Sequence, residues 1–202
     1  MNELTLAPDV ESRRRSRRSV LPLFLNRWSP RAFLSEPVDV EDLLACVEAA
    51  GWAPSSFNEQ PWRYVYATAP EDLRRFAECL APFNRVWAAT APALVCLCAR
   101  KRFSHDESEN RWSAFDAGAS WALFALEATR RGLSAHAMAG FDAGITVDRL
   151  SIPDTYEPLC FIALGRRGDP ASLPADLAAR EAPSGRKETE AVAFRSRFTS
   201  RP

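Results

Sequence analysis

The segment Arg27–Phe33 (RWSPRAF) places two arginines, a serine and a phenylalanine at every second position of a short stretch stiffened by Pro30. Guanidinium groups bind phosphate through paired hydrogen bonds, and a serine hydroxyl adds a further donor. Further along, Ala53–Trp62 (APSSFNEQPW) is dense in small hydrogen-bonding groups. Neither segment has the periodic apolar pattern of a core helix or strand. Together they predict that the chain binds a small, planar, phosphorylated molecule.

The composition is that of one well-packed domain. The chain has 202 residues, of which 47% are hydrophobic and 26% are charged, enough for one core and too few for two. Its 26 basic and 26 acidic residues cancel, so we expect no electrostatic binding to nucleic acid. The longest nearly apolar run, residues 88–99, is interrupted by Thr90 and Pro92 and is too short to span a bilayer. We therefore expect neither nucleic acid nor membrane as a partner.

The cysteines and histidines predict reduced thiols and no metal site. Five cysteines form an odd set without CxxC spacing, and four of them lie in apolar stretches, as in a cytoplasmic protein. His105 and His136 are isolated, and no Cys/His cluster exists to bind a metal ion. The N-terminus lacks the apolar block and cleavage site of a secretory signal. We predict a cytoplasmic location.

Hydrophobic periodicity predicts helices and strands along most of the chain. Residues 40–50 have the apolar spacing of an amphipathic helix, with Asp39 as its N-cap and Gly51 at the left-handed position after its end. The longest helix is predicted over residues 112–131, before Gly132, and its many small residues suit a central helix or a subunit interface. The other predicted elements are strands over 63–68, 94–98, 134–138 and 159–164 and helices over 70–80 and from 146 to 150.

Three segments fall outside this pattern. Residues 1–19 carry five arginines and are predicted to form a mobile tail before a single domain over residues 20–202. Residues 100–110 are charged and are predicted to form an exposed excursion. From about residue 170 to 202 the chain is a C-terminal extension, and its last part, residues 191–198, alternates enough to add to a sheet edge.

The common catalytic and nucleotide-binding motifs are missing from the sequence. The eight glycines form neither GxGxxG nor a P-loop, which disfavours a dinucleotide-binding fold or an NTPase. There is also no GxSxG and no cysteine with a plausible histidine partner. We therefore expect a bound cofactor to carry the chemistry, while the protein supplies its position and its electrostatic environment.

Five segments, taken in order, resemble the FMN-dependent nitroreductase family. Arg27–Phe33 is similar to the family's R-x-S-x-R-x-F segment, and Pro54–Trp62 to its P-S-S-x-N-x-Q-P-W loop. Three further similar segments are Asn84–Ala88, Met138–Asp142 and Arg186–Lys187. The resemblance covers roughly residues 20–198. Each motif alone is weak, but five in the family's order are specific.

The resemblance implies how the phosphate end of FMN would be held. Arg27 and Ser29 would contact the phosphate and the ribityl chain, within a segment that also contains Trp28. Arg186 and the adjacent Lys187 would join them from the C-terminal segment. Arg31 is also expected in the site. It would lie beneath the N1/O2 edge of the flavin, where it would raise the reduction potential.

The resemblance also implies contacts to the flavin ring. Asn84 would pair with the pyrimidine edge through its amide, which both donates and accepts hydrogen bonds. The backbone NH of Ala139 or Gly140 would face N5, and no side chain would be an obligatory acid. A loop would reach the flavin from the other subunit of a dimer through four residues: Pro54, Ser55, Ser56 and Asn58.

Other roles stay open for several of these residues. The Asn58 side chain could simply stabilise its own turn, and the Asn84 side chain could cap a helix. Arg27 and Arg31 are alternatively partners of Glu36 or Asp39 in surface ion pairs, although such pairs explain no particular spacing.

The chain departs from the family pattern at three places. Ala139 stands where many relatives carry an acidic residue or glycine, and Glu188–Thr189 follows the basic pair where many carry Pro-Leu. Residues 100–110 match nothing in the pattern, so the resemblance does not identify the substrate.

These observations predict an α+β fold with a central mixed or antiparallel sheet flanked by helices. We expect an intertwined homodimer with FMN between the subunits and the C-terminal extension reaching the partner. The implied activity is ping-pong, two-electron transfer from NADH or NADPH through flavin N5 to an electron-poor acceptor such as a nitroaromatic or quinone. The alternatives are a flavin-dependent dehydrogenase or dehalogenase on the same fold, and a protein that binds FMN without turnover.

Overall fold

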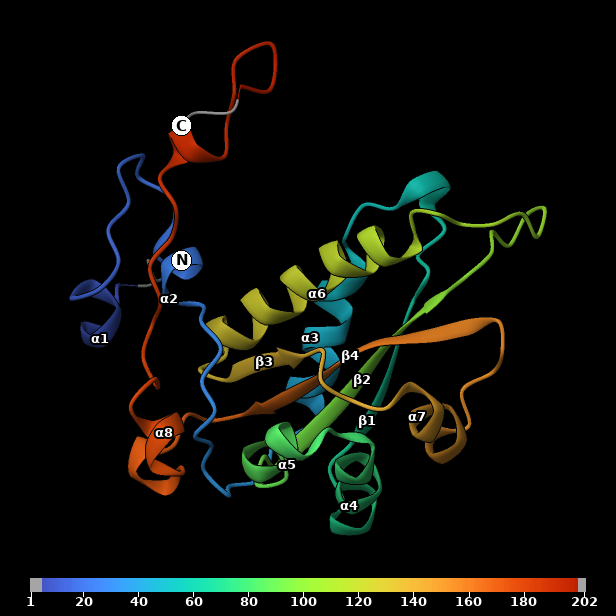
Figure 1. Cartoon of the computed structure of the whole chain (residues 1–202), viewed down its shortest axis with the longest axis horizontal. Coiled ribbons are helices and arrows are strands. Elements are labelled where there is room, and N and C mark those ends of the chain that lie inside the picture. Colours follow the sequence, from blue (N-terminus) through green and yellow to red (C-terminus); the bar gives the residue numbers. More distant parts are fainter. Residues whose placement is uncertain (1–4, 200–202) are drawn as a thin grey trace.

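A four-stranded antiparallel sheet in the order β1-β2-β4-β3 forms the middle layer of the computed structural model, which describes residues 5–199 (Figure 1). The strands are β1 (Trp62–Ala67), β2 (Ala93–Arg100), β3 (Ser134–Met138) and β4 (Tyr156–Gly165). All three pairings are antiparallel, which confirms the predicted α+β class. Each predicted strand from 63 to 164 is present within three residues of its expected ends.

Strand β2 lies at the centre of the hydrophobic core because both of its faces are buried. Val95 and Leu97 pack into the core on one face of the sheet, whereas Leu94 and Cys96 pack into the core on the other. Successive side chains of a strand point to opposite faces, so a strand covered on both sides reads as one continuous apolar run. This explains why residues 94–98 show no alternation in the sequence.

Helices cover both faces of the sheet, giving three layers (Figure 1). On one face lie α3 (Val40–Gly51) and the long α6 (Ser113–Arg130), which pack against each other. On the other face lie α4 (Pro70–Cys79), α5 (Pro82–Ala88) and α7 (Ala143–Leu150). The small residues along α6 allow it to lie close to both the sheet and α3.

Two of the three caps predicted at the ends of α3 and α6 are present in the structure. The Asp39 side chain accepts a hydrogen bond from the Glu41 NH, so it caps α3 as predicted. Gly132 has φ +73° after α6, and the bonds Leu133 NH to Ala128 O and Gly132 NH to Thr129 O close the helix. The prediction for Gly51 was wrong, because Gly51 is the last helical residue of α3 and its φ is not positive.

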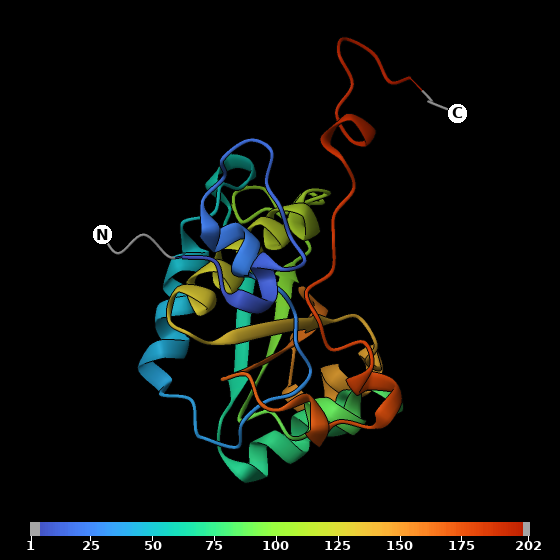
Figure 2. The same ribbon diagram turned by 90° about the vertical axis from the view of Figure 1, so that its left-hand side faces the viewer.

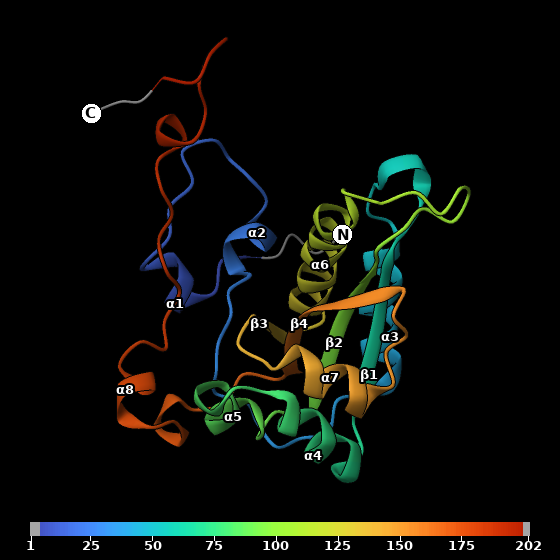
Figure 3. The ribbon, with the colours of Figure 1, turned by 45° about the vertical axis from the view of Figure 1, so that its right-hand side comes forward.

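The N-terminal and C-terminal segments run side by side at one end of the sheet (Figure 3). Ion pairs join Arg17 to Glu188 and Arg18 to Glu190. Beyond this contact the chain extends away from the layers (Figure 2). The short helices of these segments are α1 (Pro8–Glu11), α2 (Pro22–Asn26) and α8 (Ala175–Ala178), with 3-10 turns η2 (Pro170–Ser172) and η3 (Thr189–Ala191).

The terminal segments differ from their predicted structure at the C-terminal end and are partly packed at the N-terminal end. Residues 191–198 form no strand, so the predicted addition to a sheet edge was wrong. These residues have no partner strand, since the edge strands β1 and β3 pair only with the inner strands β2 and β4. The predicted mobile tail includes residues 1–4, which lie outside the described part of the chain. Within residues 5–19, Arg14 is buried against the domain, while mobility itself stays a prediction.

All five cysteines are free thiols, and four of them are buried. The Sγ atoms of Cys96 and Cys98 lie 3.7 Å apart on β2 without a disulfide. Within residues 5–199, no helix has the length and apolar character needed to cross a membrane. The same part of the chain contains no cluster of three or more metal-ligating side chains.

Gly132→Ala should destabilise the protein by roughly 1–2 kcal/mol, because a Cβ disfavours the left-handed backbone that closes α6. Gly51→Ala is the matched control: it adds the same methyl group at the end of a helix, in open space and without positive φ. Urea unfolding of both variants measures the difference. Equal stability of the two alanine variants would contradict the role of Gly132.

Candidate functional site

A cavity of about 310 Å³ lies where the segment Trp28–Arg31 meets β3 and the C-terminal extension. Its volume is at the lower end of the range for ligand pockets, roughly 300–1,000 Å³. The residues that line it are Arg14, Arg27, Trp28, Ser29, Arg31, His136, Arg180, Ala182, Ser184 and Arg186. Five of these carry guanidinium groups and none carries a carboxylate. Such a lining is suited to an anion with several oxygen acceptors, such as phosphate.

Arg14 holds three segments of the chain together beside this cavity. Its guanidinium donates hydrogen bonds to the backbone carbonyls of Leu25, Arg27 (2.8 Å) and Ser184 (2.9 Å). Arg14 is only 8% exposed. Burial lowers the pKa of Arg14, and the nearby charges of Arg186 and Arg27 lower it further. The carbonyl oxygens stabilise the charge without neutralising it, so the cavity stays positive.

Arg27 is one of the five arginines that line the cavity. Its Nη1 is 3.4 Å from Ser29 Oγ, which brings both predicted phosphate contacts together. Burial lowers the pKa of Arg27, and the charge of Arg186 adds to this effect. Arg186 is oriented by the Ser184 hydroxyl, 3.0 Å away, and by the Gly185 carbonyl, 2.8 Å away. The structure therefore places Arg27, Ser29 and Arg186 around one cavity, although 159 residues of sequence separate the first from the last.

A buried carboxylate lies behind Arg31. Glu181 Oε1 accepts hydrogen bonds from the backbone NH groups of Arg31 and Ala32. Its Oε2 has no hydrogen-bond partner and lies 3.8 Å from Arg31 Nη1. The side chain of Glu181 is 1% exposed. This contact fixes the backbone of the Arg31 segment against the C-terminal extension and gives Arg31 its ion-pair partner, so the predicted alternative of a surface pair with Glu36 or Asp39 is not observed.

His136, the third residue of β3, also lines the cavity. Its Nδ1 is 2.9 Å from the Pro30 carbonyl oxygen, and its ring packs on Trp87 at a centroid distance of 4.6 Å. Burial lowers the pKa of His136 to about 4, and the charges of Arg31 and Arg27 contribute in the same direction. The ring is therefore neutral at pH 7 and belongs to the wall of the cavity.

The backbone beyond β3 leads to a second group of predicted site residues. Gly140 follows His136 by four residues, of which the last two lie beyond the end of β3. Asn84 on α5 is 8% exposed, and its Nδ2 donates a 2.9 Å hydrogen bond to the Gly140 carbonyl. Asn84 is an interior helical residue rather than the cap that was one alternative. Within the described residues, the NH groups of Ala139 and Gly140 have no hydrogen-bond acceptor.

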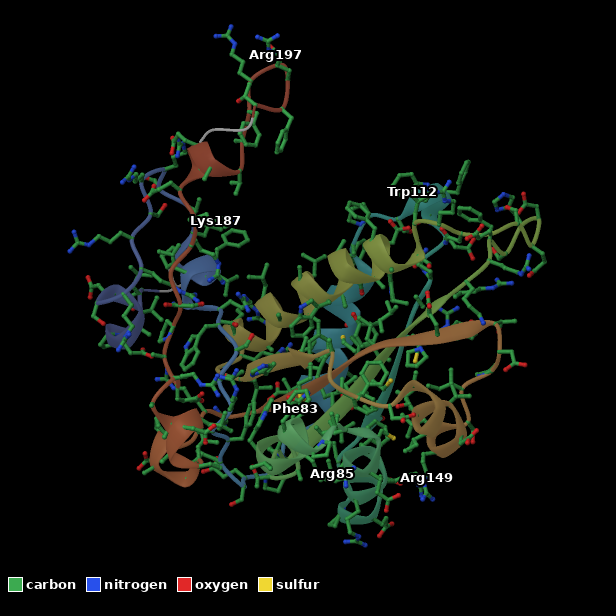
Figure 4. The ribbon with its side chains drawn as sticks, in the orientation of Figure 1. Phe83, Arg85, Trp112, Arg149, Lys187 and Arg197 are labelled. Carbon is green, nitrogen blue, oxygen red and sulfur yellow. The ribbon has the colours of Figure 1, made fainter. Side chains whose placement is uncertain are left out.

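Glycine is required at position 140 by close packing of α5. A Cβ there would lie 2.4 Å from Phe83 Cζ and 2.7 Å from Asn84 Nδ2, both shorter than real contacts allow. Phe83 is 68% exposed and projects from α5 beside this position (Figure 4). The absence of a side chain on Gly140 therefore brings α5 and its Asn84 against the backbone that follows β3.

The loop that contains Pro54, Ser55, Ser56 and Asn58 lies at the other end of α6 (Figure 1). Its 3-10 turn η1 (Ser56–Asn58) contains left-handed backbone at Phe57 and Asn58, with φ of 53° and 56°. The buried Asp116 near the start of α6 accepts a 3.0 Å hydrogen bond from the Ser56 NH, and the Ser55 hydroxyl accepts one from the Gln60 NH. These contacts fix the loop but do not bring it to the cavity.

The excursion over residues 100–110 packs against this loop. Glu59 accepts hydrogen bonds from the Ser104 NH (3.0 Å) and hydroxyl (2.9 Å). The Phe57 ring lies 5.6 Å from both Phe103 and His105. Phe57 is 82% exposed, so the loop and the excursion together form one aromatic surface. Most of the excursion is exposed, as its charge pattern predicts.

The structure thus brings together only part of the predicted site. Lys187 lines a neighbouring basic cavity with the N-terminal arginines instead (Figure 4). Trp28 lines the first cavity, and the guanidinium of Arg167 lies 5.6 Å from its ring centroid. Sequence reasoning missed four ionisable residues at this site, Arg14, His136, Arg180 and Glu181, and two small ones, Ala182 and Ser184. For Arg14 the arginine run was the only signal, and it indicated a solvated tail.

Comparison with known proteins places this chain and its fold in one family. A family model described as the Nitroreductase family matches residues 25–86 and 80–166. A solved structure described as an oxidoreductase containing FMN is 43% identical, covers 93% of this chain and 97% of its own, and has a TM-score of 0.89. The chain therefore belongs to the nitroreductase family.

Two further relatives agree with this assignment. A Streptomyces griseus protein provisionally named NADH dehydrogenase/NAD(P)H nitroreductase is 29% identical over 172 residues, covering 75% of this chain and 87% of its own length. A nitroreductase family protein from Streptococcus pneumoniae shares the fold with a TM-score of 0.71 at 20% identity, covering 86% of this chain and 98% of its own. The resemblance found in the sequence is confirmed.

Glu181→Ala should lower the free energy of unfolding by about 1–3 kcal/mol, because two backbone NH groups beside the cavity lose their acceptor. Glu181→Gln keeps an acceptor oxygen and should lose less. Asp176→Ala, which removes an exposed carboxylate on α8, serves as the control and should change stability by no more than about 0.5 kcal/mol. Urea unfolding of the cofactor-free protein measures all three. A loss for Glu181→Ala no larger than the control would contradict the anchoring role.

Proposed function

We propose that this protein is an FMN-dependent oxidoreductase that uses NADH or NADPH to reduce an electron-poor acceptor. The observation that carries the proposal is the cavity with five arginines and no carboxylate, joined along β3 to the free backbone NH groups of Ala139 and Gly140. This arrangement matches a ligand that carries a phosphate at one end and a heteroatom-rich ring at the other. The FMN named for the 43% identical structure supports the same ligand.

The residues of this chain fit the parts of FMN in order. Arg27, Ser29 and Arg186 would hold the phosphate, and Arg14 keeps their segments together. Arg31 lines the same cavity and is oriented by Glu181, so it can face the ligand beyond the phosphate. Asn84 and the backbone of Ala139–Gly140 would face the ring. The Asn84 Nδ2 already donates to Gly140, which leaves its other N–H bond and its Oδ1 for a ligand.

Bound FMN would supply two-electron chemistry, taking a hydride equivalent from NADH or NADPH at N5 and passing electrons to an acceptor such as a nitroaromatic or a quinone. The protein contributes position and charge. The positive cavity favours an anionic ligand, and the charge on Arg31 stabilises negative charge that develops nearby. No acidic side chain is obligatory, since water can supply protons. NADH or NADPH and the acceptor would use the same open face in turn, in a ping-pong cycle.

We further propose that the working unit is an intertwined homodimer. The Arg27–Arg31 segment and the Pro54–Asn58 loop lie at opposite ends of α6, whose 18 residues span about 27 Å. One chain therefore cannot bring both to a single flavin. Exposed aromatic side chains near the start of α6, Trp112 and Phe115, suit a contact with a second copy (Figure 4). The C-terminal extension, which leaves the layers, would reach the partner.

Purified protein should carry FMN or take it up, and its visible flavin absorbance should bleach when NADPH or NADH is added without oxygen. Bleaching followed by reoxidation with a nitroaromatic or a quinone supports the proposed cycle. A colourless protein that cannot be reconstituted with FMN would contradict it. Bound FMN that neither nucleotide reduces would favour a non-catalytic flavin-binding protein. Product analysis with haloaromatic substrates and with oxidisable ones separates a dehalogenase and a dehydrogenase from a nitroreductase.

Co-expression of Arg27→Ala and Asn58→Ala chains should produce mixed dimers with one tight FMN site per dimer. Each parent homodimer should bind FMN more weakly, about 10- to 100-fold for Arg27→Ala, because a charge-assisted bond is worth about 1.5–3 kcal/mol. In the mixed dimer, one site combines the unmutated Arg27 of one chain with the unmutated Asn58 of the other.

The control for this experiment is Arg166→Ala, which removes an exposed arginine that pairs with Glu36 outside the cavity. It should leave FMN affinity unchanged. Separately tagged chains allow the mixed dimers to be isolated, and FMN titration measures the number of tight sites. No tight site in the mixed dimer would show that each site is built from one chain.

A further inference from the structure

His136 presents a hydrogen-bond acceptor to a cavity that is otherwise rich in donors. Its Nδ1 lies 2.9 Å from the Pro30 carbonyl oxygen, which can only accept, so Nδ1 carries the proton. In the neutral ring Nε2 is then a bare acceptor. Within residues 5–199 Nε2 has no hydrogen-bond partner, although the Ser29 backbone also interacts with the ring and raises its pKa. His136 lines the cavity.

The neutral form of this ring is strongly favoured. Burial lowers the pKa of His136 to about 4, and Arg31 and Arg27 lower it further by charge repulsion. The Trp87 ring, 2% exposed, covers the imidazole at a centroid distance of 4.6 Å and prevents it from turning away. At neutral pH the cavity therefore keeps one uncharged acceptor in a fixed position beside its guanidinium groups.

The other polar groups of the cavity differ from His136 in the hydrogen bonds that they can make. The arginines can only donate hydrogen bonds, and they are satisfied by the oxygens of an anion. The Ser184 carbonyl already accepts bonds from Arg14 and Arg186. The dianionic group of a phosphate ester brings acceptors alone and would leave Nε2 without a donor. A ligand that carries a hydroxyl group next to its phosphate satisfies both.

We propose that His136 is a cofactor-binding residue whose Nε2 accepts a hydrogen bond from a hydroxyl of the ribityl chain. This inference rests on the proposed function, since it takes FMN as the ligand. It assigns a role to a residue outside the five sequence motifs. The role is to distinguish a polyol phosphate from a phosphate without neighbouring hydroxyls.

The test combines variants of His136 with FMN analogues that lack single ribityl hydroxyls. His136→Asn can keep a donor near the position of Nδ1 for the Pro30 carbonyl but has no acceptor at the position of Nε2. His136→Gln is the matched variant that can place an acceptor oxygen near Nε2. FMN affinity, measured by quenching of flavin fluorescence, should fall about 2- to 12-fold in His136→Asn, the range of one hydrogen bond. His136→Gln should retain more of it.

The analogues separate a specific hydrogen bond from a general loss of structure. The wild-type protein should bind one of the 2′-, 3′- or 4′-deoxyribityl analogues more weakly than FMN, by a similar factor. His136→Asn should bind FMN and that analogue equally. If His136→Asn discriminates between them as the wild type does, or if the wild type binds every analogue like FMN, the assignment is wrong while the proposed function stands. If the wild type does not bind FMN at all, the proposed function itself fails.

Discussion

Five guanidinium groups around one small cavity repel one another, and this end of the molecule is organised to keep them together. Arg14 is held by three backbone carbonyls, and Glu181 anchors the segment that carries Arg31. Carbonyl dipoles stabilise positive charge without cancelling it, so the cavity keeps its attraction for an anion. The same contacts join three segments distant in sequence: residues near 14, residues 25–32 and residues 181–184. The contacts that pack these segments together are therefore the same contacts that keep the cavity positively charged.

The arrangement of α6 explains why the motifs do not all meet in one chain. The Arg27–Arg31 segment passes one end of this helix, and the Pro54–Asn58 loop is fixed to the other end through Asp116. A helix of this length separates the two groups by more than the reach of any side chain. The family resemblance assigns both groups to one cofactor. The two facts agree if the second group serves a neighbouring copy, which makes association a condition for the site.

Most secondary structure followed from local patterns, and each of the two failures has a definite structural cause. The N-cap at Asp39 and the left-handed Gly132 depend on neighbours in the chain, so their signals were sufficient. Gly51 was assigned to the wrong position because a glycine near a helix end does not by itself indicate which residue is the last helical one. Residues 191–198 alternate like a strand, but a strand also needs a free edge to pair with, which their sequence cannot reveal.

The sequence by itself determined the four strands, the helices α3, α4, α6 and α7 and the buried character of β2, and it predicts the phosphate chemistry of Arg27, Ser29 and Arg186. These depend on residue type and on short-range periodicity. Only the tertiary structure decided that Arg14 belongs to the domain and that Glu181 lies behind Arg31. It also decided that Lys187 faces a different cavity and that His136 offers one fixed acceptor. The positions of Arg14, Glu181 and His136 depend on which distant backbone groups lie within hydrogen-bonding distance. Short-range patterns carry no information about contacts between segments more than a hundred residues apart.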